Sequence, residues 1–127
     1  MIFVDTNVFM YAVGREHPLK AEARRFFEDS VREHTRLATS SEVLQELLHA
    51  YVPVGRLSAF DAALTLLEAC AVDVWPLEPD DVRAARALVD THPALGARDL
   101  VHLASCRRRG VRSIKTFDRA LAAAQIR

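Results

Sequence analysis

Short apolar segments alternate with longer amphipathic segments along the chain, and this alternation constrains the fold more than any other feature of the sequence. Strands are predicted at the apolar segments, which are residues 2–4, 36–39, 72–75 and 113–117. Helices are predicted at the amphipathic segments, which are residues 18–32, 40–51, 58–70, 79–91, 98–109 and 119–125. The first strand, Ile2-Phe3-Val4, is apolar on both faces, as in a parallel sheet that helices cover on both sides. The alternation therefore predicts the α/β class, with helices around a central parallel sheet.

Residues at several helix boundaries support this assignment. Ser58 is suited to cap its helix, and Pro79 is suited to a first helical turn. Gly110 stands where a left-handed residue would end the helix of residues 98–109. Thr39 and Glu42 have the spacing of a capping box, in which the glutamate side chain accepts a hydrogen bond from the backbone at the helix start. With 127 residues and no repeat or linker, the chain is expected to form one domain over residues 1–127.

The balance of charge neither indicates nor excludes nucleic-acid binding. Lys+Arg and Asp+Glu number 17 each, so the net charge attracts no polyanion, although a local basic patch can serve beside an acidic site. The two cysteines, Cys70 and Cys106, belong to no Cys/His cluster, which argues against a structural zinc site. Reduced buried thiols suit a cytoplasmic protein. The first apolar run ends at Asp5, too early for a signal peptide or a membrane span.

Two acids directly follow predicted strands. Asp5 ends the first strand, and Asp118 follows the strand of residues 113–117. Ligands of an open parallel sheet bind outside the carboxyl ends of its strands. If the two strands are near neighbours, both carboxylates therefore point into one crevice. By contrast, Asp80 and Asp81 open a helix after a proline and are interpreted as structural.

Two further acids lie on helices that are predicted to begin near the same edge. Glu46 lies one turn after Glu42 and borders the apolar face of its helix. Asp99 lies in the first turn of a later helix, and His102 shares its face three residues on. His102 could bond a site carboxylate or shuttle a proton, but a lone helical histidine is more often a structural group. The joint placement of four acids at one edge is a stronger signal than any single acid.

Each of these acids also has a purely structural explanation. Asp5 could accept a hydrogen bond from the backbone that follows it, and Asp118 could cap the last helix. Asp99 could simply be favoured by the dipole at a helix start, and Glu46 could be a solvated helix acid. The position of each acid alone does not decide between structure and function.

Four carboxylates cannot crowd together as bare anions. Either some of them take up protons, because mutual repulsion raises their pKa values, or cations neutralise them. Oxygen ligands without cysteine or a histidine pair suit Mg²⁺ or Mn²⁺. Such a centre activates a water and stabilises a leaving oxygen, which is the chemistry of metal-assisted phosphodiester hydrolysis.

Four segments of the chain carry a resemblance to a known family. They are MIFVDTNVFMYA, SSEVLQELLHAY, LGARDLVHLASCRRRG and IKTFDRAL. In this order and spacing they closely resemble the PIN-domain family, and the most similar branch is that of the VapC-type toxins of bacterial toxin–antitoxin modules. The resemblance covers nearly the whole chain. It implies a three-layer α/β/α sandwich on a central parallel sheet, and an Mg²⁺- or Mn²⁺-dependent endoribonuclease that acts on RNA.

The resemblance also implies roles for individual residues. It implies metal ligation by Asp5 and Asp99, and positioning of metal or water by Glu46 and Asp118. Glu46, and not Glu42, matches the second acid of the family. Three residues match polar positions that usually support these acids, namely Thr6, Asn7 and Thr116.

The family further implies two protein partners. One is an antitoxin encoded beside the toxin, which typically buries a segment in the toxin's groove and blocks the acids. The other is a second toxin subunit in a homodimer. Only nine residues follow Asp118, so the final strand that is usual in the family is expected to be short or missing here.

Basic residues give a weaker indication of an RNA surface. Arginines at residues 107–109 form the densest basic cluster, but the helix dipole favours cations at a C-terminus without any ligand. They also lie a full helix, roughly 15 Å, from Asp99, so they could grip only a flanking part of an RNA. Arg15 and Arg98 are closer to the predicted crevice and could contact RNA phosphate or the antitoxin. Simple solvation at the surface is the alternative.

Three other functions compete with a nuclease. A PIN-like module that binds RNA or protein without cutting would have no electrostatic reason to keep four repelling acids. A receiver-type signalling domain has a strand-end lysine, here Lys115, but it needs an acceptor aspartate after the third strand, where this chain has Trp75-Pro76-Leu77. A haloacid-dehalogenase-like phosphatase needs an aspartate two positions after Asp5, where this chain has Asn7.

Overall fold

Four parallel strands form the central sheet in the computed structural model, which describes residues 1–125. The strands lie in the order β3-β2-β1-β4, with β1 (Ile2–Val4), β2 (Leu37–Ser40), β3 (Asp73–Trp75) and β4 (Ser113–Lys115). Phe3 of β1 pairs with Ala38 on one side and with Ile114 on the other. The strand that ends at Asp5 and the strand that precedes Asp118 are therefore direct neighbours, as the predicted crevice requires.

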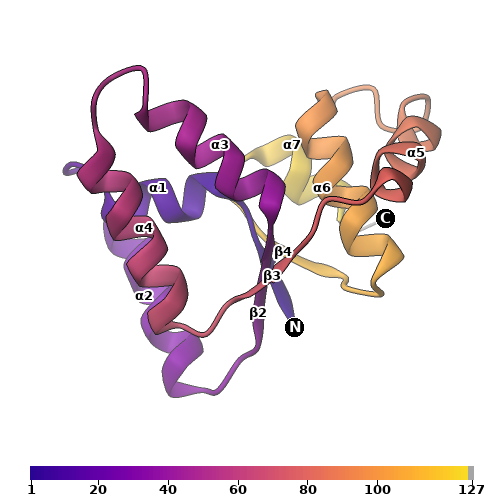
Figure 1. The fold of residues 1–127 in the computed structure, drawn as a ribbon. Helices are drawn as coiled ribbons and strands as arrows, with labels where there is room; N and C mark the ends of the chain where they lie inside the picture. The colour runs from indigo at the N-terminus through magenta and orange to yellow at the C-terminus, as the bar shows by residue number, and fades with distance from the viewer. Residues whose placement is uncertain (126–127) are drawn as a thin grey trace.

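Helices cover both faces of this sheet (Figure 1). The helices that connect β1 to β2 and β2 to β3 pack together on one face: α1 (Thr6–Val13), α2 (Lys20–Arg32), α3 (Ser41–Tyr51) and α4 (Leu57–Ala69). The connection from β3 to β4 lies on the other side of the sheet and contains α5 (Pro79–Leu88) and α6 (Ala97–Arg108). The last helix, α7 (Arg119–Ala124), packs against α6. This arrangement confirms the three-layer α/β/α sandwich with a central parallel sheet.

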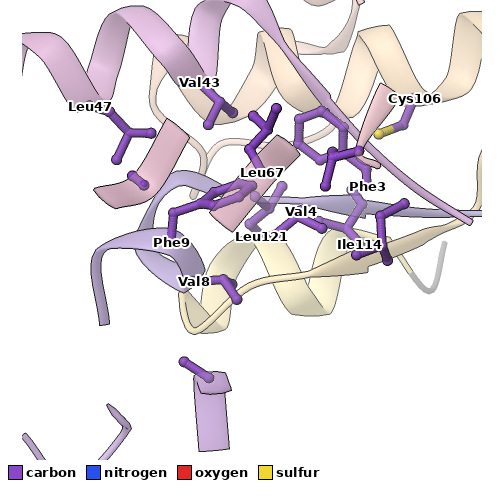
Figure 2. Close-up of a cluster of buried hydrophobic side chains, with 14 of the residues drawn as sticks. Phe3, Val4, Val8, Phe9, Val43, Leu47, Leu67, Cys106, Ile114 and Leu121 are labelled. Carbon is purple, nitrogen blue, oxygen red and sulfur yellow. The ribbon is translucent and has the colours of Figure 1, made fainter. Parts of the chain in front are cut away.

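The hydrophobic core lies between the sheet and its helices (Figure 2). Phe3 and Val4 of β1 are completely buried although neighbouring strand residues point to opposite faces. This confirms that β1 is covered on both sides. Other fully buried members come from α1, α3 and α7, namely Val8, Phe9, Val43, Leu47 and Leu121. The core thus anchors the elements whose ends carry the candidate acids.

Helix α1 is not among the helices predicted from the sequence. Its residues, Thr6–Val13, include β-branched and aromatic side chains whose intrinsic helix propensity is modest. Burial of Val8, Phe9 and Ala12 outweighs this propensity, and the Asp5 side chain caps the helix by accepting from the Thr6 N–H. Tertiary packing therefore stabilises a helix that the local sequence pattern does not predict.

The capping box predicted at the start of α3 is wrong. The expected capping box at Glu42 is not formed, because the Ser40 hydroxyl caps α3 by accepting from the Val43 N–H at 3.3 Å. The Thr39 hydroxyl instead donates to the carbonyl oxygen of Val4 at 2.9 Å and ties β2 to β1.

Other helix and strand ends differ less from expectation. Helix α4 begins at Leu57 without a side-chain cap, so Ser58 lies inside it rather than at its N-cap. Gly110 has a φ of 69° directly after the C-cap of α6, which confirms the predicted left-handed stop. Pro79 is the first residue of α5, also as predicted.

At the outer edge of the sheet, a side chain accepts a hydrogen bond from the backbone of β4. β4 ends at Lys115, two residues earlier than predicted, and within residues 1–125 no fifth strand follows it. Because the Lys115 carbonyl accepts from the Asp5 N–H on the β1 side, the alternation of a strand directs the Ile114 N–H to the outer edge. There it donates to the Gln125 side-chain oxygen at 2.6 Å.

Among residues 1–125, no helix is both long enough and apolar enough to span a membrane. Cys70 and Cys106 are free thiols, as the sequence predicted.

Candidate metal-binding carboxylate site

Asp5 is fixed at the carboxyl end of β1 by two hydrogen bonds. Its Oδ1 accepts from the Thr6 N–H at 2.7 Å, and its Oδ2 accepts from the Thr116 hydroxyl at 2.7 Å. Only 4% of the residue is exposed. The structural explanation for Asp5, a bond to the following backbone, is therefore correct, but it uses only one oxygen. The second bond comes from the segment after β4 and fixes the carboxylate at the edge where β1 and β4 end.

Glu46 reaches the same place from the second turn of α3. Its Oε2 accepts from the Thr6 hydroxyl at 2.6 Å, and its Oε1 lies 2.8 Å from Nε2 of His102 on α6. Thr6 thus binds Asp5 through its backbone and Glu46 through its side chain. The Glu46 side chain is only 12% exposed, so it is not a solvated helix acid.

Asp99 lies in the first turn of α6, where the charges of the other acids act on its carboxyl group. Burial raises the pKa of Asp99 to about 6, and the negative charges of Asp5 and Asp118 add to the effect. A favourable helix dipole would lower this pKa, so repulsion and desolvation dominate. Asp99 therefore lies in the electrostatic field of the cluster rather than in an isolated helix cap.

Asp118 has the structural role that the sequence left open, and its charge also acts on Asp99. Its Oδ1 caps α7 by accepting from the Leu121 N–H at 3.0 Å, and its own N–H donates to the Thr116 hydroxyl at 3.0 Å. Its charge also raises the pKa of Asp99. The structural explanation thus accounts for one oxygen of Asp118, while the charge still acts on the site.

The polar residues beside the acids form a connected network. The Asn7 side-chain amide donates to the Thr116 hydroxyl at 3.3 Å, and its oxygen accepts from the Phe117 N–H at 3.1 Å. Thr116 in turn donates to Asp5. Asn7 and Thr116 therefore hold the segment between β4 and Asp118 against the start of α1.

His102, for which the sequence favoured a structural role and left a bond to a site carboxylate open, lies against two of the acids. It is 1% exposed, and its Nε2 lies 2.8 Å from Glu46 Oε1 and 3.7 Å from Asp5 Oδ1. Its spacing of three residues from Asp99 was the available signal, and it indicated a shared helix face but not the partner on α3. Of the two options weighed from the sequence, the bond to a site carboxylate is the one observed.

The pKa values of Asp5, Glu46 and His102 are shifted in different directions. Burial raises the pKa of Asp5, although His102 and Thr116 oppose the shift. Burial also acts to raise the pKa of Glu46, but the hydrogen bond and charge of His102 outweigh it, so this pKa is lowered. Correspondingly, the bond to Glu46 and the charge of Asp5 raise the pKa of His102 in spite of its burial. His102 compensates Glu46, while Asp5 and Asp99 remain acids that resist ionisation.

These residues fit a divalent cation. Asp5, Glu46 and His102 each offer one ligand atom, and the three atoms lie within 4.8 Å of one another. The raised pKa values of Asp5 and Asp99 show that protein groups do not fully offset their charges. A cation bound to carboxylate oxygens would offset them, and Mg²⁺ and Mn²⁺ prefer such ligands.

The basic residues divide between the site and the remainder of the surface. Arg98 is exposed at the start of α6, and its charge helps to lower the pKa of Glu46. Arg15 is exposed in the loop after α1. Arg108 and Arg109, by contrast, bind the buried carboxylate of Asp81 at 2.6 and 2.9 Å. Two arginines of the densest basic cluster are therefore occupied inside the protein.

A larger groove lies away from the acids. It has a volume of about 1100 Å³ and runs between α2 and α4, past Phe27, Val31 and Leu66. None of the four acids lines it. The carboxylate site is instead a small cluster at the edge of the sheet.

Comparisons with known proteins agree with this geometry. The family model described as "PIN domain" matches residues 2–126. Ribonuclease VapC23 of Mycobacterium tuberculosis is 63% identical over 124 residues, which are 98% of this chain and 98% of that protein.

Solved structures share the fold at lower identity. The crystal structure of Mycobacterium tuberculosis VapC20, described as a Sarcin-Ricin loop cleaving toxin, aligns with a TM-score of 0.82 at 21% identity, covering 98% of this chain and 95% of that chain. A chain of a toxin–antitoxin complex from Klebsiella pneumoniae aligns with a TM-score of 0.66 at 18% identity, covering 93% and 87%.

Proposed function

Because the chain belongs to the PIN-domain family, we propose that it is a metal-dependent endoribonuclease and the toxin of a toxin–antitoxin pair. One observation carries the proposal: Thr6 and His102 join Asp5 to Glu46, and the charges of Asp5, Asp118 and Glu46 raise the pKa of Asp99. The 63% identity to a protein named ribonuclease supports the same activity for this chain.

The four acids of the proposed centre have different roles. Asp5 and Asp99, whose pKa values are raised, would hold Mg²⁺ or Mn²⁺. Glu46 and Asp118 would position the attacking water, since hydrogen bonds fix both oxygens of Glu46 and one oxygen of Asp118. When bound, the metal supplies activation of a water and stabilisation of the leaving oxygen of the phosphodiester.

The supporting residues keep these carboxylates in a single orientation. Thr6 bridges Asp5 and Glu46, and Thr116 holds the second oxygen of Asp5. Asn7 secures the segment that carries Thr116. Such preorganisation limits the reorganisation that the reaction would otherwise require. Arg15 and Arg98 are proposed to contact the phosphates of the RNA from the rim of the site.

A binding module without catalysis is less consistent with these residues. Burial and repulsion raise the pKa of Asp99 to about 6, so keeping the acids together costs stability when no cation is bound. A protein that only bound RNA would gain from replacing one of them by a neutral side chain.

The proposed partners follow from the same family. We infer an antitoxin that covers the acids and a homodimer of this chain, in line with the toxin–antitoxin complex whose subunit shares the fold. Free thiols at Cys70 and Cys106 suit a reducing compartment such as the cytoplasm. Light scattering of the purified chain measures its oligomeric state directly.

Replacement of Asp5 tests the proposed activity. Wild-type protein and the Asp5→Asn variant are incubated with a pool of cellular RNAs in Mg²⁺, Mn²⁺ or EDTA. We expect metal-dependent cleavage that falls by at least about 100-fold in the variant, because the charge that offsets the metal is lost. Glu42→Gln is the control, since Glu42 is a half-buried acid on α3, one turn before Glu46, and is not one of the four acids. Equal cleavage by wild type and Asp5→Asn would refute the proposed site.

A further inference from the structure

His102 occupies a position in which two roles are geometrically open. Its Nε2 lies 2.8 Å from Glu46 Oε1 and 3.7 Å from Asp5 Oδ1, so the nitrogen could join these oxygens as a metal ligand. Alternatively, an Nε2–H group could donate to Glu46 and leave the metal to oxygen ligands. The two roles differ in which ring nitrogen carries the proton.

The other ring nitrogen decides between these roles. Nδ1 of His102 is buried, and no group among residues 1–125 is a hydrogen-bond partner for it. As a metal ligand through Nε2, the imidazole would carry its proton on Nδ1, where the N–H would be buried without an acceptor. Metal-bound histidines almost always donate that second N–H to a carboxylate or carbonyl. His102 has no such acceptor in the described part of the chain.

The donor role satisfies the observed contacts. An Nε2–H group pointing at Glu46 forms the 2.8 Å bond, and the ring is held in place beside Phe3, with ring centroids 5.4 Å apart. With Thr6 on its other oxygen, Glu46 is then oriented from both ends. This holds for the neutral ring that carries its proton on Nε2, because that tautomer has no N–H on the buried Nδ1.

We infer that His102 is a positioning residue, which orients Glu46 by donating an N–H and does not itself ligate the metal. The inference rests on the proposed metal site. It assigns an all-oxygen ligand set to a site in which an imidazole lies within bonding reach of two carboxylates.

Two amide substitutions separate the roles. His102→Gln places an amide N–H near the position of Nε2, whereas His102→Asn places it near Nδ1, out of reach of Glu46. Mn²⁺ affinity is measured by titration of the electron paramagnetic resonance signal of free Mn²⁺. We expect His102→Gln to bind Mn²⁺ almost as tightly as wild type and His102→Asn to bind about tenfold or more weakly. Equal affinities for the Asn and Gln variants, both folded by circular dichroism, would overturn the inference.

A spectroscopic measurement on the wild type needs no variant to fold. Electron spin-echo modulation of bound Mn²⁺ detects a directly bonded ¹⁴N nucleus, and we expect no such strong coupling. A coupling typical of a bonded imidazole would make His102 a ligand and overturn the inference, while the metal site itself would stand. Failure of the wild type to bind Mn²⁺ at all would instead refute the proposed metal site, and the inference with it.

A second inference comes from a different set of contacts, at the start of the loop after α1. The exposed ring of His17 lies over the Tyr11 ring with centroids 4.5 Å apart and planes tilted by 32°. The edge of Phe117 contacts Tyr11, with ring centroids 5.5 Å apart. His17 Nδ1 accepts from the Leu19 N–H at 3.1 Å, which helps to fix the ring.

This aromatic cluster, Tyr11, His17 and Phe117, adjoins the carboxylate site. Phe117 stands between Thr116, which binds Asp5, and Asp118, and Tyr11 lies one turn after Asn7 on α1. Bases of unpaired RNA stack on such rings, whereas bases inside a duplex are already stacked. Resting on the proposed function, we propose that His17 stacks on an unpaired base close to the cleaved phosphate.

Substitution of His17 tests this base-stacking role. In the Asp5→Asn background, binding of a short single-stranded RNA is compared for His17, His17→Ala and His17→Phe. We expect about tenfold weaker binding for alanine and recovery for phenylalanine, with little change for the matching duplex. Equal binding by alanine and histidine forms would overturn the proposal, as would failure of phenylalanine to restore binding. If even the His17 form fails to bind, RNA recognition under the proposed function is refuted.

Discussion

Two buried aspartates in this molecule have opposite electrostatic environments. Asp81 on α5 is 0% exposed, and Asp5 at the end of β1 is 4% exposed. Burial acts to raise the pKa of both. For Asp81, hydrogen bonds from Arg109, the Glu78 N–H and Arg108 outweigh burial and lower the pKa to about 2. For Asp5 burial prevails, and the pKa is raised.

The difference distinguishes an acid whose charge is neutralised by the protein from acids whose charges the protein does not fully offset. Asp81 is neutralised by the protein's own arginines, which also reach Glu78 and the Trp75 ring. Asp5 is surrounded by other carboxylates and shares only one buried histidine with Glu46. Burial alone therefore does not account for the opposite pKa shifts of the two acids, whereas the arginine partners of Asp81 do.

The largest expected effect on stability is at Asp81. Asp81→Ala leaves two arginines without their shared carboxylate, and we expect the free energy of unfolding to fall by about 3 kcal/mol. This is the low end for a broken buried ion pair, because the arginine side chains remain partly exposed. Chemical denaturation at pH 7 measures the change. A loss as small as that of an ordinary surface substitution would remove the contrast with Asp5.

Binding of a divalent ion at the carboxylate site should raise the free energy of unfolding by about as much as Asp81→Ala lowers it. At a concentration of Mn²⁺ 100 times its dissociation constant, we expect a gain of about 2.7 kcal/mol. The gain should persist in Asp81→Asn and disappear in Asp5→Asn, because only the latter alters the carboxylate site. Thermal unfolding with and without Mn²⁺ measures it. An equal gain in both variants would mean that the ion binds elsewhere.

Replacement of Asp99 should change the free energy of unfolding by less than replacement of Asp81, and in the opposite direction. Its folded-state pKa of about 6 exceeds its ordinary value of 3.8, so the folded state binds its proton more tightly than the unfolded state. The contribution of Asp99 to stability is thus full below pH 4 and is lost as the pH rises through 6.

Without metal, Asp99→Asn should therefore stabilise the protein at pH 7.5 by about 1 kcal/mol, a value discounted for partial exposure. At pH 4 the variant and wild type should be equally stable. Denaturation at the two pH values provides the comparison. Destabilisation of the variant at pH 7.5 would show that Asp99 is a structural cap.

The smallest effect is expected at Glu42, the half-buried acid one turn before Glu46. Glu42→Ala should change the free energy of unfolding by no more than about 0.5 kcal/mol, because Glu42 does not form the expected capping box. RNA cleavage should also be unchanged. Loss of cleavage in this variant would transfer the role of Glu46 to Glu42.

The sequence predicted the fold where its pattern is local. Alternating strands and helices, Pro79 at a helix start and Gly110 at a helix end all depend on neighbouring residues, and the structure has each of them. Helix α1 was missed because burial of Val8 and Phe9, which depends on distant packing, outweighs weak propensity.

The candidate site was predictable to the same extent. Strand ends identified Asp5 and Asp118, and helix position identified Asp99. The bond between His102 and Glu46 joins residues 56 positions apart, so no local spacing could reveal it. The pairing of Arg108 and Arg109 with Asp81 could not be predicted for the same reason, so two arginines that the sequence assigned to the helix dipole instead bind a buried carboxylate.

The short C-terminal segment has a consequence for how this molecule meets other polypeptides. β4 is the last strand among residues 1–125, and its one outward N–H, that of Ile114, is already occupied by the amide of Gln125. An unguarded strand border invites a foreign strand to add to it, which is a common route to aggregation. The Gln125 side chain thus occupies the donor that β4 would offer to such an added strand, so we expect this edge of the sheet to resist strand addition.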